Sequence, residues 1–167
     1  LGMSTGSFAD GLAVFMALTS SLVAAIIVFY SFGYIEHYDN QNEYYMMVVL
    51  FIGAMMGLVF STNLILIYGF WEISAVCCWR LIGFYRKKDI VLRADKAFLV
   101  TVGGALLMLV GFIAIYIQAG TFDLMELRGR GLDNWIMVLI LFGILSKSAT
   151  VPLHSWLPDA GVAPSPV

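Results

Sequence analysis

This sequence is poor in charged residues. Only 12% of its 167 residues are Asp, Glu, Lys or Arg, and 61% are hydrophobic. Soluble domains carry about 25% charged residues, so a chain this poor in charge cannot cover a water-exposed surface. Unbroken apolar stretches cross a bilayer as helices, and the composition therefore predicts an all-α membrane protein. The formal net charge of −2 argues against a nucleic-acid partner, which would require a basic surface.

The sequence is equally poor in residues for soluble-type catalysis. Its two cysteines are the neighbours Cys77 and Cys78, and a disulfide between adjacent residues would be badly strained. We interpret both as small apolar side chains inside a hydrophobic segment. No glycine-rich phosphate loop, metal-ligand spacing or nucleophile with a neighbouring base is present. The sequence therefore predicts no catalytic, cofactor-binding or metal-binding residue, and no cofactor.

Apolar stretches divide the chain into about five transmembrane helices within a single domain, residues 1–167. The stretch Tyr44–Tyr85 is too long for one crossing of a hydrocarbon core of roughly 30 Å, so two helices must share it. The predicted break is residues 61–63, Ser-Thr-Asn, since these residue types are good helix N-caps. Because the chain does not begin with methionine, we expect a fragment or a processed chain. The approximate spans are 11–34, 44–60, 62–85, 97–118 and 135–151.

Basic residues are unevenly distributed between the two ends of these helices. Five of the nine Lys and Arg residues lie in segment 86–96, whereas the loop 120–134 carries two. With five spans, segment 86–96 and the acidic loop 36–43 fall on one face, and the turn 61–63 and the loop 120–134 on the other. Lys and Arg concentrate on the cytoplasmic side of membrane proteins. The loop 86–96 is therefore predicted to be cytoplasmic.

The last apolar segment, 135–159, contains a lysine where a membrane is driest. If Trp135 lies near an interface, Lys147 lies about 18 Å deeper, because each helical residue advances about 1.5 Å. A lysine at that depth costs roughly 2.5–3.5 kcal/mol on insertion scales and needs a partner or a wet cavity. Pro152 has no N–H for the carbonyl of Ser148, which predicts a broken last helix that lines a polar cavity. Such helices are typical of ion pathways.

Three further residues stand out. Glu72 lies mid-span in a helix that starts from the same face as that of Lys147, so adjacent helices would allow a buried ion pair. If the pair separated, the isolated ammonium would release its proton, and charge separation would drive proton transfer. Alternatively, the pair only fixes the registry of the helices. His154 is either a proton relay or a structural hydrogen-bonding residue, and Arg80 is a possible anchor at the membrane surface.

Small and hydroxyl residues in the last two spans predict how these helices pack. Gly103, Gly104 and Gly111 in the fourth span permit close approach of another helix. In the fifth span, the Ser and Thr side chains of residues 146–150 are expected to bond backbone groups that the break frees, rather than to take part in catalysis.

Two long motifs make the sequence similar to a known family. STNLILIYGFWEISAVCCWRLIGFY and KSATVPLHSWLPDAGVAPSPV resemble the antiporter-like membrane subunits of respiratory complex I, membrane-bound hydrogenases and Mrp-type sodium/proton antiporters; ADGLAVF and VFYSFGY resemble the start of that family's bundle. The resemblance implies a larger bundle with two inverted repeats, of which this chain supplies most of the first. It also implies that Glu72 is the family's intramembrane glutamate and Lys147 the lysine of its first broken helix. His154 matches a histidine common there, whereas Arg80 stands where leucine is usual.

The resemblance implies proton translocation within a redox-driven complex of the NADH-quinone oxidoreductase or hydrogenase type, in a prokaryotic inner membrane. The chain would be one subunit of a translocase, and electron transfer would take place on partner membrane subunits. Two alternatives stay open. One is an Mrp-type Na⁺/H⁺ antiporter subunit, in which sodium-dependent proton flux needs no redox substrate. The other is a non-conducting structural membrane module, in which Lys147→Ala would leave proton pumping intact.

Overall fold

The computed structural model describes residues 8–167; residues 1–7 of the predicted single domain lie outside the described part. Residues 8–167 form helices and connecting segments, with an isolated bridge between Asn63 and Asp123 and no strand. The all-α prediction is confirmed. The helices are α1 (Gly11–Ile35), α2 (Gln41–Phe60), α3 (Leu64–Ile82), α4 (Lys88–Ala119), α5 (Leu124–Leu127), α6 (Asn134–Lys147) and α7 (Leu157–Ala160).

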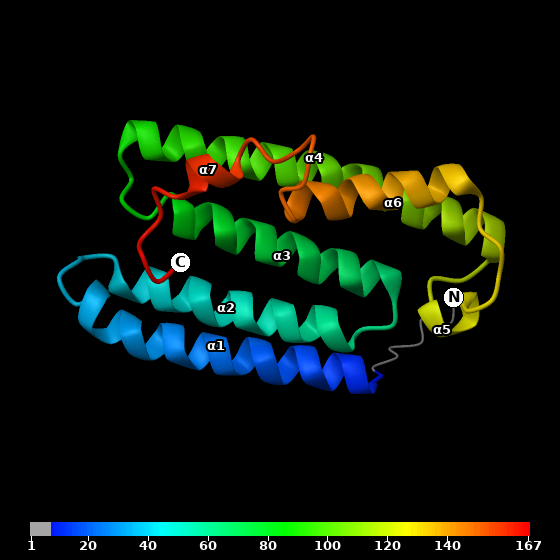
Figure 1. The fold of residues 1–167 in the computed structure, drawn as a ribbon, viewed down its shortest axis with the longest axis horizontal. Helices are drawn as coiled ribbons and strands as arrows, with labels where there is room; N and C mark the ends of the chain where they lie inside the picture. Colours follow the sequence, from blue (N-terminus) through cyan, green and yellow to red (C-terminus); the bar gives the residue numbers. More distant parts are fainter. Residues whose placement is uncertain (1–7) are drawn as a thin grey trace.

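The long helices run side by side along the length of the molecule (Figure 1). α1 pairs with α2, α3 packs against both α2 and α4, and α6 lies along α4. By length and composition, α1 to α4 are each able to cross a membrane, whereas α6 is apolar but has only 14 residues. The arrangement is that of a membrane helical bundle in which the last apolar helix, α6, is short.

The turn between α2 and α3 lies where the sequence predicted the break. Asn63 is the N-cap of α3, and its side-chain oxygen accepts hydrogen bonds from the N–H groups of Ile65 and Leu66 at 2.9 and 3.4 Å. These are two of the orphan N–H groups that every helix start leaves unpaired. The cap explains why one long apolar stretch divides into two helices at this point.

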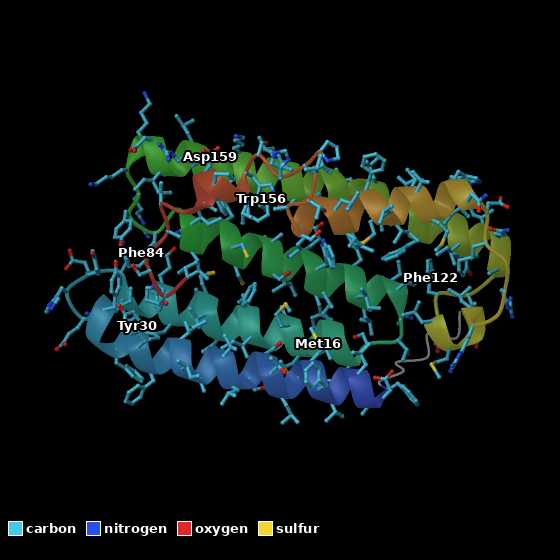
Figure 2. The ribbon with its side chains drawn as sticks, viewed as in Figure 1. Met16, Tyr30, Phe84, Phe122, Trp156 and Asp159 are labelled. Atoms are coloured by element: carbon cyan, nitrogen blue, oxygen red, sulfur yellow. The ribbon has the colours of Figure 1, made fainter. Side chains whose placement is uncertain are left out.

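Two backbone hydrogen bonds join this turn to the loop that follows α4. The N–H of Leu64 donates to the carbonyl of Phe122 at 3.0 Å, and the N–H of Leu124 donates to the carbonyl of Thr62 at 2.9 Å. The turn 61–63 and the loop after α4 therefore lie at the same end of the bundle, as the sequence predicted. Figure 2 shows Phe122 at this end and Phe84 at the opposite one.

α4 begins earlier than the fourth predicted span. It starts at Lys88, so most of segment 86–96 is helical, and the prediction of a loop there was wrong. No Gly or Pro interrupts residues 88–96, and Asp89 in the first turn is favourably placed at the positive end of the helix dipole. A charged segment can leave the membrane as a helix as readily as a loop. Which side of the membrane this end faces stays a prediction.

α4 and α6 approach closely because glycines occupy their contact. A Cβ atom added to Gly104 would lie 2.1 Å from Oγ of Ser146, and one added to Gly143 would lie 2.5 Å from Cβ of Met108. The predicted packing role of Gly104 is confirmed, whereas a Cβ on Gly103 would meet nothing within 4 Å. The tight contact fixes α6, and with it the position of its last residue, against α4.

Candidate functional site

α6 ends at Lys147, and hydroxyl residues pair its last carbonyl groups. The N–H and Oγ of Ser148 both donate to the carbonyl of Ile144, at 3.0 and 2.8 Å. The N–H and Oγ1 of Thr150 donate to the carbonyl of Leu145, at 3.1 and 3.3 Å. Backbone acceptors at a helix end need such partners, and side chains supply them here as the sequence predicted.

The helix ends before Pro152 rather than inside a continuous helix that the proline breaks. Ser148 is the C-cap, and Ala149 has a φ of 50°, a left-handed conformation that terminates helices. The predicted span 135–151 is therefore helical only to residue 147. Pro152 lies in the non-helical segment that follows, where it cannot donate to an upstream carbonyl. Its contribution to the break stays a prediction.

The segment after the break folds back against α4. The indole N–H of Trp156 donates to the carbonyl of Ser146 at 2.9 Å, and the amine of Lys96 contacts Asp159 at 2.6 Å and the carbonyl of Ser155 at 3.0 Å. Figure 2 shows Trp156 and Asp159 together beside α4. The hydrogen bond from Lys96 holds the pKa of Asp159 below its ordinary value. The break is thus bounded by α6 on one side and by a docked short helix on the other.

The amine of Lys147 reaches across to α3. It donates to the carbonyl of Trp71 at 3.1 Å and to the hydroxyl of Ser74, and it lies 5.2 Å from the centre of the Trp71 ring. Each contact stabilises a positive charge. α3 and α6 both pack on α4, and the long Lys147 side chain bridges the remaining gap. The sequence-predicted lysine is therefore part of a polar contact between two helices.

Glu72 is near this contact but does not join it. Within residues 8–167, no ion pair between Glu72 and Lys147 is formed, and Oε1 of Glu72 is buried without a hydrogen-bond partner. Glu72 and Ser74 are two positions apart on α3, and such residues do not face the same side of a helix. The structure thus places the two predicted residues close in space, with the amine bound on a different face of α3 from the carboxylate.

The other two candidates lie outside this contact. The side chain of His154 is exposed and makes no hydrogen bond in the described part of the chain. Arg80 lies in the last turn of α3 and contacts Glu43 at the start of α2, which Arg86 also contacts. An anchor at the membrane surface fits that location, and both proposed roles stay predictions.

Sequence reasoning missed Ser74 and Glu43. A serine in a membrane helix carries no signal of its own, because most such hydroxyls bond a carbonyl one turn earlier. Glu43 could have been proposed from charge alone, since it is an acidic residue at the end of the bundle where basic residues gather.

An apolar cavity of about 330 Å³ between α1, α2 and α3 is a separate feature, and Lys147 does not line it.

Comparison with known proteins identifies the class to which this bundle belongs. The model of the family described as "NADH:quinone oxidoreductase/Mrp antiporter, TM" matches residues 61–167, and the chain belongs to that family. The sequence-based resemblance is confirmed. The chain is thus part of a multi-pass integral membrane protein.

Individual relatives show which members of this family the chain is similar to. The chain is similar to Na(+)/H(+) antiporter subunit A1 of Staphylococcus haemolyticus, with 38% identity over 100% of this chain and 22% of the relative. It is 34% identical to the same subunit of Staphylococcus aureus strain JH9, over 99% of this chain. It also resembles a chain in the structure of the Mrp complex from Dietzia sp. DQ12-45-1b, with a TM-score of 0.87, 30% identity and coverage of 94% of this chain and 18% of that one. The chain spans about a fifth of the length of these relatives.

Proposed function

We propose that this chain forms part of the proton path of an Mrp-type Na⁺/H⁺ antiporter subunit, with Lys147 as the residue that takes up and releases the proton. The observation that carries the proposal is the surroundings of the amine. It lies at the end of a broken helix and is bound by two neutral oxygens of α3, with no carboxylate contact among residues 8–167. An ammonium held only by neutral groups keeps its proton less firmly than one in an ion pair.

Glu72 is the proposed second element of the path. If the flexible Lys147 side chain moves from Ser74 toward Glu72, the carboxylate favours the charged amine, and the return movement favours release of the proton. The non-helical backbone after Lys147 supports this proposal, because unwound segments at mid-membrane are where transporters bind ions. His154, three residues before Leu157 in the segment after the break, is a candidate for passing the proton onward.

The antiporter now replaces the redox-driven complex as the leading interpretation. The family description names both classes, but the relatives described above are Na(+)/H(+) antiporter subunits and a chain of an Mrp complex. In an antiporter, ion gradients drive the exchange of Na⁺ for H⁺, and no electron donor is needed. The proposed partners are accordingly other membrane subunits of an Mrp-type complex. We further propose that the end of the bundle with Arg86 and Lys88 faces the cytoplasm, because basic residues gather there.

The test is exchange in membrane vesicles that contain the full-length subunit within its complete complex, in a host without other Na⁺/H⁺ antiporters. In wild-type vesicles with an imposed pH gradient, adding Na⁺ without any redox substrate should dissipate that gradient. Lys147→Ala should reduce the initial exchange rate by at least about a hundredfold, in the range usual for losing a proton-transfer group. Lys87→Ala is the matched control, because Lys87 is exposed at the start of α4. It should exchange at the wild-type rate.

Two results would contradict the proposal. Exchange that survives Lys147→Ala, with impaired recovery of the assembled complex, would support the non-conducting structural module instead. Proton movement that requires an electron donor and does not depend on Na⁺ would instead favour a subunit of a redox-driven complex.

A further inference from the structure

The hydroxyl of Ser74 contacts a lysine amine, which no other serine hydroxyl of residues 8–167 does. It is fully buried, at 0% exposure, and its hydroxyl donates to the carbonyl of Trp71 at 2.7 Å. The same hydroxyl oxygen accepts a hydrogen bond from the amine of Lys147, and the carbonyl of Trp71 accepts a second. A hydroxyl has one donor and two acceptor sites, so it can bond the carbonyl and the ammonium at the same time.

These bonds form a closed triangle that polarises its members. When the hydroxyl donates its hydrogen to the Trp71 carbonyl, its oxygen becomes a better acceptor for the ammonium, because linked hydrogen bonds strengthen one another. Ser31 provides the contrast. It is also 0% exposed and donates to the carbonyl of Ile27 at 2.7 Å, but its second partner is the hydroxyl of Tyr44 and not a charge. Burial of a serine therefore does not by itself create a cation contact.

The triangle also decides on which side of α3 the amine rests. Ser74 and Trp71 are three residues apart and share a helix face, whereas Glu72 lies on a different face. An amine bound to Ser74 is consequently not at the carboxylate of Glu72. The hydroxyl thus stabilises a position of Lys147 in which the charge has only neutral oxygen partners.

We propose that Ser74 is a positioning residue for Lys147, and that its hydroxyl holds the charged amine at the Trp71 carbonyl and away from Glu72. This inference rests on the proposed function, since it assumes that Lys147 carries the transported proton. Loss of the hydroxyl removes one of the two acceptors that hold the ammonium in the observed position. The ammonium occupies this position rather than one beside Glu72, so moving to Glu72 in the variant does not recover the full stabilisation of the charged form. Protons are then released at a lower pH.

Few other titratable groups face this amine. On α3 they are Glu72, Cys77 and Cys78, which interact with Lys147 electrostatically. The stretch of α4 from residue 97 to 115 carries no titratable side chain, and Lys147 is the sole titratable residue of α6. A change in the pH dependence of exchange on altering Ser74 therefore reports on Lys147 and on the α3 groups beside it, Glu72, Cys77 and Cys78.

The experiment measures Na⁺/H⁺ exchange against pH with the full-length subunit in its complete complex. Ser74→Ala should move the alkaline limb of the pH profile to lower pH by about one unit, as expected for the loss of one hydrogen bond to a charged group. The apparent KM for Na⁺ should stay within about twofold of wild type, because the change alters proton affinity and not sodium binding. Ser74→Thr keeps the hydroxyl and should restore the profile. Ser31→Ala is the buried control and should leave it unshifted.

Each other outcome overturns a defined claim. An unshifted profile for Ser74→Ala, or an equal shift for Ser74→Thr or Ser31→Ala, overturns the positioning role. If Ser74→Ala does not assemble, Ser74→Cys takes its place, since a thiol fills the site but is a weak acceptor; it should shift the profile in the same direction, and an unshifted profile overturns the role. Lys147→Ala is measured beside these variants. Exchange that survives it overturns the proposed function, whereas an inactive Lys147→Ala with an unshifted Ser74→Ala overturns this inference alone.

Discussion

The indole N–H of Trp156 donates to the backbone carbonyl of Ser146 across the helix break, at 2.9 Å. In a continuing helix, the carbonyl of Ser146 would accept a hydrogen bond from the N–H four residues later. Here the indole of Trp156, ten residues further along the chain, is its donor instead. The contact connects the last turn of α6, which carries Lys147, to the segment docked on α4.

Trp156→Phe should loosen the break while keeping an aromatic ring at this position. It removes the N–H together with the pyrrole half of the indole, and a buried carbonyl left without its partner costs about 1–3 kcal/mol. Hydrogen exchange at the amides of Ser148 and Thr150 in the full-length protein should accelerate by roughly 5- to 150-fold, because local opening becomes easier. Trp135→Phe is the control, since the Trp135 indole contacts the exposed Asp133. Unchanged protection in Trp156→Phe would show that the indole does not hold the break.

Gly104→Ala should destabilise the protein, whereas Gly103→Ala should not. The new methyl group at position 104 would meet Ser146 at 2.1 Å and the carbonyl of Phe142 at 3.1 Å, which forces the two helices apart. Overpacking of this kind costs about 1–3 kcal/mol. At position 103 the added methyl meets nothing within 4 Å, and alanine favours a helix over glycine by up to about 1 kcal/mol.

The measurement is the midpoint of thermal unfolding of the purified full-length protein in detergent. Gly104→Ala should lower it, and Gly103→Ala should leave it unchanged or raise it. Equal loss of stability in both variants would mean that the close contact between α4 and α6 is not where the structure places it.

Attachment of the segment after the break should depend on pH through Asp159. Its pKa is lowered in the folded protein by the hydrogen bond from Lys96, so the ion pair stabilises the fold at every pH above the ordinary Asp value of about 3.9. That contribution is lost as the pH falls through the lowered pKa.

Hydrogen exchange at Ala160 and Ala163, corrected for the intrinsic effect of pH, should therefore speed up below that ordinary value. Asp159→Asn should show the faster exchange already at neutral pH and little further change on acidification. Asp89→Asn is the control, because Asp89 is exposed at the other end of the basic segment. Identical pH profiles for Asp159→Asn and wild type would contradict the role of the pair.

Local signals in the sequence predicted the helices and the charge at the break. A long apolar run with Asn63 in its middle predicts two helices because the cap is a local interaction, and the hydroxyl residues beside Lys147 bond carbonyls within five positions. The start of α4 was missed because charge alone does not distinguish a loop from a helix that leaves the membrane.

The contacts of the lysine could not be predicted in the same way. Lys147 meets Trp71 and Ser74 across 76 and 73 positions of the chain, and Lys96 meets Asp159 across 63. Such pairs depend on the rotation of each helix about its axis. The glycine contact sets that rotation for α4 and α6. For α3, a helix this uniformly apolar shows no clear face from which its rotation could be predicted. The sequence thus predicted which residue is unusual and not what surrounds it.

The most direct test of the central claim is to replace Lys147 with arginine in the assembled full-length antiporter and to measure Na⁺/H⁺ exchange in vesicles. Arginine keeps the positive charge and can donate to the same oxygens, but it does not release a proton in proteins. If Lys147 carries the proton, Lys147→Arg should assemble normally and exchange as poorly as Lys147→Ala. Exchange near the wild-type rate in Lys147→Arg would show that only a fixed positive charge is needed there, and would contradict the account.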